Sequence, residues 1–427
     1  MKVLWLGDAG SHTGFARVTH GIGERLVAMG HDLHVLAVNY DGDYWPTNMK
    51  LYVPTKLVPS NIYGQSRFVE MLATVEPDVV VMLNDPFVIA KFLWRNKWDE
   101  QKVLLRYRPI LAYMPVDGTN QPTTWKILEK VTRPVLMSNF GRTWLPDAPV
   151  VWHGADAEAF RPADEGGYIS SGGMEVSSKR DAKRALGYDP DGFLVVRVDR
   201  NSRRKDFSST FKALMPVMER HADIQVHFHC KPTGEDGVEL PQLFSRADPN
   251  IAERFFVPGD HNTRIGWPQS DLAILYNAAD LFVSTSWGEG FGLTLAEALA
   301  CGVPVVAQNV SSITEVVGPG GVLIEPLTTI TVTSGEDQWL PDVPAFSDAI
   351  ERLYLSPGER RKLGAAGRKH IEKFSWDEAA RRFHLLLTEL QSKRPAEEIE
   401  VPNDSTDVQG FHGGDGSVRR KRGRSRT

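Results

Sequence analysis

The chain has 427 residues, which is enough for two domains with a sizeable core. Hydrophobic residues make up 41% and charged residues 24%, and a net charge of −5 excludes a global attraction to nucleic acid or to an anionic membrane. The sequence has no apolar run of membrane-spanning length and no Cys/His spacing typical of a metal site. Its two cysteines, Cys230 and Cys301, fit a reducing compartment, so we expect a cytoplasmic protein.

The first part of the chain alternates short apolar runs with helical patterns. A strand at residues 2–6 runs into a Gly-rich turn at 7–14, and a helix follows with apolar side chains at 18, 22, 26 and 29. Further strands are predicted at 34–38, 77–83 and 110–114. Asp117 follows the last of these, where ligands of open α/β sheets bind. A carboxylate that only stabilises the turn before Gly118 is an equally good interpretation.

The second part repeats this alternation, with strands predicted at 193–198, 224–230, 280–284 and 303–307. The loop after the first of these strands carries four cations, Arg200, Arg203, Arg204 and Lys205. A run of charges is usually a solvated loop, and that alternative stays open here.

The most informative stretch follows the strand at 280–284. Trp287 to Gly292 forms a Gly-rich turn, and 293–300 is predicted as a helix that contains Glu297. Unpaired amides at the start of that helix suit a phosphate. Glu289 and Glu297 suit neutral hydroxyl groups instead. The stretch therefore predicts a ligand with both phosphate and polyol character.

Residues 289–298, Glu-Gly-Phe-Gly-Leu-Thr-Leu-Ala-Glu-Ala, and residues 302–307, Gly-Val-Pro-Val-Val-Ala, resemble the signature of the retaining GT-B glycosyltransferases of family 4, the glycosyl transferases group 1. The resemblance implies an α/β protein with two Rossmann-like domains that face a cleft. It covers roughly residues 1 to 390 and is strongest in the second domain.

The resemblance also implies the roles of individual residues. Arg200 and Lys205 hold the donor diphosphate, Glu289 contacts the transferred sugar, and Glu297 holds the nucleotide ribose. Arg203 or Arg204 is an alternative partner for the diphosphate. Asp117 lies near the anomeric carbon or the acceptor hydroxyl. The remaining expected donor contacts are Gly10, Gly14, Gly290, Phe291, Gly292 and Leu293.

We therefore predict transfer of a sugar, with retention, from a UDP-, GDP- or ADP-linked donor, without a metal ion or another cofactor. The acceptor is left open between a glycan, a lipid, a protein and a modified nucleic-acid base. A sugar-nucleotide-binding non-enzyme, an epimerase and a phosphorylase on the same scaffold are the alternatives.

The expected domain organisation runs as follows: an acceptor-side domain at 1–162, a linker or insertion at 163–178, a donor domain at 179–375, a helix at 376–392 that crosses back to the first domain, and a tail at 393–427. A second insertion is expected at 326–345. The tail is predicted to be disordered, and its basic end offers at most a weak contact to a polyanion.

Overall fold

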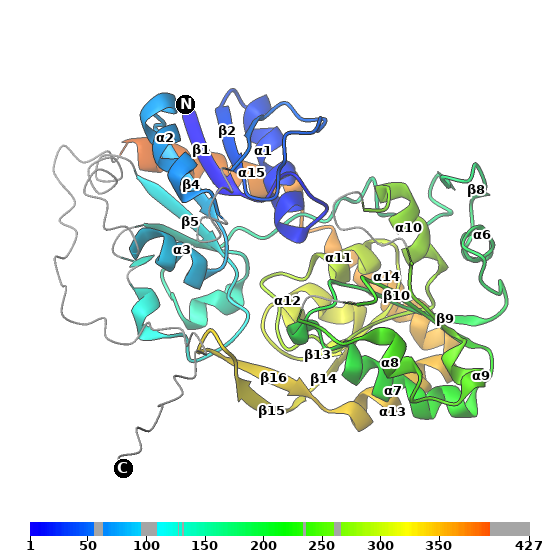
Figure 1. Cartoon of the computed structure of the whole chain (residues 1–427). Coiled ribbons are helices and arrows are strands. Elements are labelled where there is room, and N and C mark those ends of the chain that lie inside the picture. The colour runs from blue at the N-terminus through cyan, green and yellow to red at the C-terminus, as the bar shows by residue number, and fades with distance from the viewer. Residues whose placement is uncertain are drawn as a thin grey trace, which may run out of the picture.

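The computed structural model describes residues 1–54, 63–94, 109–126, 128–129, 132–233, 236–259 and 266–392. The predicted disordered tail at 393–427 lies outside the described residues. Within them the chain forms two α/β domains, each built on a six-stranded parallel sheet (Figure 1). The strand orders are β3-β2-β1-β4-β5-β6 and β11-β10-β9-β12-β13-β14. Both sheets therefore have the arrangement of two βαβ halves in which ligands bind at the carboxyl ends of the strands.

The first domain is a sheet with helices α1, α2 and α3 around it (Figure 1), and two of its inner strands are apolar. Strands β4 and β5 are buried along their whole length, which is typical of parallel strands covered on both faces. Its elements are β1 (Lys2–Gly7), α1 (Gly14–Ala28), β2 (Asp32–Ala37), β3 (Lys50–Tyr52), α2 (Gln65–Val75), β4 (Val79–Leu83), α3 (Pro86–Trp94), β5 (Ile110–Met114), η2 (Thr123–Lys126), β6 (Arg133–Leu136) and η3 (Asn139–Thr143).

Residues 163–178, predicted as a linker or insertion, contain a small antiparallel hairpin of β7 (Tyr168–Ile169) and β8 (Glu175–Val176). Tyr168 attaches this hairpin to the preceding segment, because its hydroxyl group accepts a hydrogen bond from the backbone amide of Arg161 at 2.9 Å. Helix α6 (Lys179–Ala185) then leads into the second sheet.

The second domain repeats the alternation of strands and helices. Its elements are β9 (Phe193–Val198), η4 (Arg203–Lys205), α7 (Phe207–Arg220), β10 (Ile224–His229), α8 (Leu240–Phe244), α9 (Pro249–Ala252), β11 (Phe255–Phe256), α10 (Gln269–Ala278), β12 (Leu281–Ser284), α11 (Leu293–Ala300), β13 (Val305–Gln308), α12 (Ile313–Val317), η5 (Gly318–Gly320), β14 (Gly321–Ile324), α13 (Val343–Leu355) and α14 (Pro357–Ile371).

The last helix, α15 (Trp376–Ser392), packs against α1 in the first domain, as the orange ribbon in Figure 1 shows. Ser375 caps it, since its hydroxyl group accepts a hydrogen bond from the amide of Glu378 at 3.1 Å. Phe383 is fully buried, and its ring lies 5.6 Å from that of Trp5 and 4.9 Å from that of Tyr113. The end of the chain's described part therefore belongs to the core of the first domain.

Two further contacts join the domains. The hairpin of β15 (Pro326–Thr331) and β16 (Asp337–Pro341) lies at 326–345, where an insertion was predicted. It reaches the loop after β5, where Thr119 and Asp337 exchange backbone hydrogen bonds of 2.8 and 2.9 Å. Separately, the carboxylate of Glu315 accepts hydrogen bonds from the amides of Asn139 and Phe140 at 3.0 and 2.6 Å. These bonds connect the loops after β5 and β6 of the first domain to the second domain.

Candidate active site

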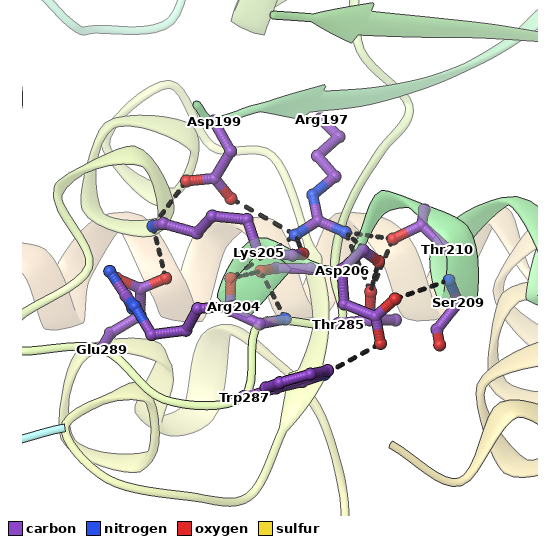
Figure 2. A network of polar contacts seen from close by, with 12 residues as sticks. Arg197, Asp199, Arg204, Lys205, Asp206, Ser209, Thr210, Thr285, Trp287 and Glu289 are labelled. Atoms are coloured by element: carbon purple, nitrogen blue, oxygen red, sulfur yellow. Dashed lines mark hydrogen bonds and ion pairs between the residues drawn. The ribbon is translucent and has the colours of Figure 1, made fainter. Parts of the chain in front are cut away.

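A chain of charged side chains follows the carboxyl end of β9. Asp199 comes directly after the strand, and Lys205 ends the short 3-10 helix η4. The Lys205 ammonium group lies 2.6 Å from Asp199 Oδ1 and 2.6 Å from Glu289 Oε1, so it bridges the two carboxylates (Figure 2). The sequence predicted Lys205 and Glu289 at one site, and the structure places them in direct contact.

Arg197 supports this loop through its guanidinium group. It is fully buried at the end of β9, and its guanidinium group donates hydrogen bonds to the carbonyl of Lys205, to the carbonyl of Asp206 at 3.3 Å and to Thr285 Oγ1 at 2.9 Å (Figure 2). It also lies 4.4 Å from the ring of Phe207, a cation–π contact. These bonds hold the backbone of the loop, and with it the position of the Lys205 side chain.

Asp206 explains how the loop turns into helix α7. Its backbone is left-handed, with φ of 48°, and its carboxylate accepts hydrogen bonds from the amide of Ser209 at 3.0 Å and from the indole of Trp287 at 2.9 Å (Figure 2). Asp206 therefore caps the helix and ties the basic loop to the glycine-rich loop that carries Glu289.

Glu289 is held rigidly and stays ionised. Its amide donates to Ser311 Oγ at 2.9 Å, and its carbonyl accepts from Ser312 Oγ at 2.7 Å. Burial favours the neutral acid, but the positive charges of Lys205 and Arg204 outweigh burial and lower the pKa of Glu289 to about 2. A carboxylate in this state accepts hydrogen bonds and does not exchange protons near neutral pH.

Arg204 connects Glu289 with the first domain. Its guanidinium group lies 3.3 Å from Glu289 Oε2 and 3.4 Å from Asp117 Oδ2, and it donates to the carbonyl of Gly288. Among the cations of this loop, the sequence favoured Arg200 and Lys205, with Arg204 as an alternative. Arg200 is exposed at the end of β9, and Arg204 is the arginine that contacts both candidate carboxylates.

The glycines of the loop allow the two domains to touch. A Cβ atom on Gly288 would collide with the carbonyl oxygen of Asp117, and one on Gly290 would collide with Pro115. Gly292 has φ of 96°, which places it in the left-handed region just before helix α11. Phe291 is 2% exposed and packs its ring 4.8 Å from that of His153, so only its backbone is available to a ligand.

Glu297 lies on helix α11 and has a different environment. Its Oε2 accepts a hydrogen bond from the hydroxyl group of Tyr276 at 2.8 Å, and its Oε1 forms an ion pair with Arg17 of helix α1. It is also part of the wall of a cavity of about 900 Å³ between the two domains. The cavity is further lined by aromatic and basic side chains, including His12, His20, Trp45 and Trp267.

The two candidate glycines of the loop after β1, Gly10 and Gly14, lie in different surroundings. A Cβ atom on Gly14 would lie 3.9 Å from the Leu293 side chain, so Gly14 and Leu293 face each other across the cleft. Gly10 instead packs against the backbone of Tyr40, where a Cβ atom would come within 2.5 Å of Cα. The missing side chain at Gly10 therefore serves packing within the first domain in this structure.

Asp85 is a candidate residue that the sequence interpretation missed. It follows β4 as Asp117 follows β5, so the same rule about strand ends could have found it. Burial and the negative charge of Asp117 raise the pKa of Asp85 to about 6, although Arg204 and Arg200 act in the opposite direction. Asp199 also follows a strand end, whereas Arg17 and Tyr276 carry no such signal.

Comparisons with known proteins agree with this architecture. Residues 192–355 match the family model described as glycosyl transferases group 1. The match includes the basic loop and both glutamates of the glycine-rich stretch.

Two curated relatives illustrate the sequence similarity. The O-antigen chain mannosyltransferase B of Escherichia coli is 38% identical over 125 residues, which are 28% of this chain and 29% of the relative. A D-inositol 3-phosphate glycosyltransferase of Kribbella flavida is 30% identical over 234 residues, which are 53% of this chain and 47% of the relative. The chain thus spans about half or less of the length of the curated relatives it matches.

Solved structures show the same fold over nearly the whole chain. The sucrose-phosphate synthase of Thermosynechococcus elongatus has a TM-score of 0.65 at 20% identity, with 92% of this chain and 99% of that chain covered. The Anabaena protein HepE, solved in complex with UDP and glucose, has a TM-score of 0.65 at 16% identity, with 91% and 99% covered. The chain therefore has the GT-B fold, as the sequence predicted.

In the described part of the chain, no helix combines the length and the apolar character that a membrane span requires. Within the same ranges no three His, Cys, Asp or Glu side chains are grouped so that they could hold a metal ion.

Proposed function

We propose that the protein transfers a sugar from a nucleotide diphosphate sugar to an acceptor hydroxyl group, with retention of configuration at the anomeric carbon. The observation that carries the proposal is the Lys205 bridge, which fixes an ionised Glu289 at the end of one parallel sheet, opposite Asp117 of the other. The family match of residues 192–355 and the structural neighbours solved with UDP support it.

Glu289 is proposed to bind hydroxyl groups of the transferred sugar. Its pKa of about 2 keeps it ionised, so it serves as a hydrogen-bond acceptor and is a poor proton donor or base. Because its backbone is anchored by Ser311 and Ser312, the carboxylate offers this contact in a fixed geometry. A fixed contact contributes to rate when it is stronger in the transition state than in the bound substrate.

The diphosphate is proposed to lie between the basic loop and the start of helix α11. Arg200 and Lys205 supply positive charge, and the first amides of the helix, at Leu293 and just before it, add a dipole of the same sign. The bond between the anomeric carbon and the diphosphate oxygen breaks as the acceptor oxygen forms its bond to that carbon. The leaving diphosphate keeps the electron pair, and the proton of the acceptor hydroxyl group passes to it.

Glu297 is proposed to hold the ribose of the nucleotide. Its carboxylate lies in the cavity wall between the domains and is oriented by Tyr276. Arg17 forms an ion pair with the other carboxylate oxygen, Oε1, in this structure. A ribose hydroxyl group would therefore share this oxygen with Arg17 or displace Arg17 from it. Gly14 and Leu293, which face each other nearby, would then flank the donor.

We further propose that the reaction needs no metal ion or other cofactor, because Arg200, Arg204 and Lys205 already place positive charge beside the expected diphosphate. We propose a cytoplasmic location, because Cys230 and Cys301 are both buried free thiols.

Binding and turnover together test the proposed function. Thermal-shift measurements with UDP, GDP and ADP identify the base, and a nucleotide at a hundredfold excess over its Kd should stabilise the fold by about 2.7 kcal/mol. Release of nucleoside diphosphate from the matching sugar donors then tests for catalysis, and proton NMR of the glycoside reports its anomeric configuration. Binding without any release would favour the non-enzymatic alternative, and an inverted product would exclude retention.

A further inference from the structure

The outer edge of strand β16 binds two loops of the candidate active site. Alternate residues of a strand direct their backbone groups to opposite edges, so Asp337 and Trp339 present theirs on the edge that faces away from β15. The loop after β5 binds at the first of these residues, since Thr119 and Asp337 exchange hydrogen bonds of 2.8 and 2.9 Å. The glycine-rich loop binds at the second, where the Trp339 amide donates to the Trp287 carbonyl at 3.1 Å. One strand edge therefore holds two loops that come from different domains (Figure 1).

The bonded residues lie close to candidate site residues along the chain. Thr119 is the second residue after Asp117, and Trp287 is the second residue before Glu289. The two loops also touch each other, because a Cβ atom on Gly288 would collide with the carbonyl oxygen of Asp117. The hairpin therefore binds both loops near the point where the two domains meet.

Side chains reinforce this edge of the hairpin. Asn120 has a left-handed backbone, with φ of 51°, and its side-chain amide donates to Asp337 Oδ2 at 2.7 Å. Gln308 is fully buried, and its side-chain amide donates to the carbonyl of Trp339 at 3.2 Å and to the carbonyl of Ser286 at 2.8 Å. The backbone conformation of each loop is thus supported by contacts to the hairpin.

Arg204 connects the same two loops in a different way. Its guanidinium group lies between the carboxylates of Asp117 and Glu289, so this contact depends on charge. A diphosphate bound in the cleft would compete for the same cation. The bonds of β16 join neutral backbone groups instead, and a charged ligand offers these groups no better partner. The hairpin contact therefore has the properties of a connection that survives ligand binding.

The hairpin is separate from the cavity between the domains. That cavity, of about 900 Å³, is lined by Arg17 of the first domain and by Trp267 and Glu297 of the second. The hairpin contributes none of the described residues that line it. A ligand therefore fills the cavity without displacing the hairpin.

We propose that the hairpin, residues 326–341, is a brace whose bonds to both loops persist through turnover and hold Asp117 at a fixed position relative to Glu289. The inference rests on the proposed function, since this pair would align the acceptor with the transferred sugar. Asp337 and Trp339 are positioning residues that act through their backbone groups. A fixed alignment favours the reaction because the reacting groups need no further ordering. The donor enters through the cavity, so no bond of the hairpin has to break.

A cross-link tests whether the brace stays in place. Thr119 and Asp337 form an antiparallel pair, whose Cα atoms lie about 5.5 Å apart when both backbone bonds are made, and this separation suits a disulfide. The full chain with Thr119→Cys and Asp337→Cys is oxidised, and its kcat is compared with that of the same protein in dithiothreitol. Cys230 and Cys301 are buried and do not interfere. We expect the cross-link to form and kcat to agree within about twofold. A pair that does not cross-link, or a larger loss of kcat that dithiothreitol reverses, would overturn the proposal.

A proline substitution tests whether the bond to the glycine-rich loop positions Glu289. Trp339→Pro removes the side chain and the amide that donates to Trp287, whereas Trp339→Ala removes the side chain alone. Proline is tolerated where the amide points away from the partner strand, so the hairpin itself is kept. We expect kcat of Trp339→Pro to lie at least about tenfold below that of Trp339→Ala, because a displaced contact lowers the rate. The affinity for the selected nucleoside diphosphate should differ by less than about twofold between the two variants.

The matched control is Glu325→Gln, at an exposed position just before β15, which should keep the wild-type kcat. Equal kcat in Trp339→Pro and Trp339→Ala would overturn the brace, and so would a loss of nucleotide affinity that parallels the loss of kcat. A wild type that releases no nucleoside diphosphate from any sugar donor would contradict the proposed function instead. The two failures are therefore distinguishable.

Discussion

Glu289 and Glu297 belong to one short stretch of sequence, yet the structure holds them in different ways. Glu289 is bound by Lys205 and Arg204 of its own domain, and its backbone is anchored at both ends. Glu297 is oriented by Tyr276 of its own domain but pairs with Arg17 of the other. The difference indicates that the sugar side of the donor site is preformed, whereas the ribose side depends on how the two domains approach each other.

The largest effect on stability is expected from removing the Lys205 bridge on the sugar side of the donor site. Lys205→Met removes the cation between Asp199 and Glu289, which are 9% and 7% exposed, and leaves two buried carboxylates facing each other. Loss of one partner of a buried pair typically costs 3–5 kcal/mol, so the free energy of unfolding should fall by about 3 kcal/mol in urea denaturation. Lys212→Met, an exposed lysine on α7, is the control and should change it by less than about 0.5 kcal/mol. An unchanged midpoint for Lys205→Met would show that the bridge contributes nothing to stability.

The domain contact at Glu315 should have the next largest effect. Its carboxylate accepts hydrogen bonds from Asn139, Phe140 and Trp152 of the first domain. Glu315→Gln removes the charge from these bonds, and we expect the protein to lose about 2 kcal/mol of stability. If the bonds also set the domain spacing, the affinity for the selected nucleoside diphosphate should fall together with stability. Small-angle scattering that shows the same radius of gyration together with full stability would contradict this role.

The ribose side can be tested by ligand choice. Glu297→Gln should weaken binding of the nucleoside diphosphate that the binding screen selects about tenfold, which corresponds to roughly 1.4 kcal/mol, because a charge-assisted hydrogen bond to the ribose becomes a neutral one. Inorganic pyrophosphate, which lacks the ribose, should bind the variant as it binds the wild type. Calorimetry that finds equal losses for both ligands would show that Glu297 does not act on the ribose.

The smallest effect concerns pH. The pKa of Asp85 is raised to about 6 by burial and by Asp117, so the folded protein binds a proton there that the unfolded chain releases near its ordinary value of 3.8. Stability from this group should therefore rise as pH falls from above 6 toward 4, by on the order of 1 kcal/mol. Other groups also act on this carboxyl group, and the substitution Asp85→Asn keeps all of them in the chain: Tyr63, Glu336, Arg200 and Arg204. The difference in stability between wild type and Asp85→Asn should depend on pH in this window, and a constant difference would contradict the raised pKa.

The sequence predicted the parts of this architecture that local patterns determine. Apolar runs such as residues 79–83 mark buried parallel strands, and Gly292 with the helix formers after it marks the start of α11. Glu289 and Lys205 follow strand ends in the sequence, so their approach to one edge of the sheet was predictable.

Other features depend on packing between distant segments, which no local pattern records. Arg17 reaches Glu297 only because α1 faces α11 across the domain boundary. Glu336 lies beside Gly118 only because the hairpin bonds to Thr119. The Gly-rich turn at 287–292 was predicted, but the close approach of Gly288 and Gly290 to the loop after β5 of the facing domain was not.

The most direct test of the donor site is the turnover of Glu289→Gln with the sugar donor that the binding screen selects. The substitution keeps the size of the side chain, and it removes the charge that would accept hydrogen bonds from the sugar. Release of nucleoside diphosphate should fall by about 10²–10³-fold, the scale for losing one fixed polar contact to a transition state. The affinity for the matching nucleoside diphosphate should stay within about threefold of the wild type, because the nucleotide contacts lie elsewhere. Wild-type turnover in Glu289→Gln, measured beside Glu325→Gln as the control, would remove Glu289 from the site and contradict the account.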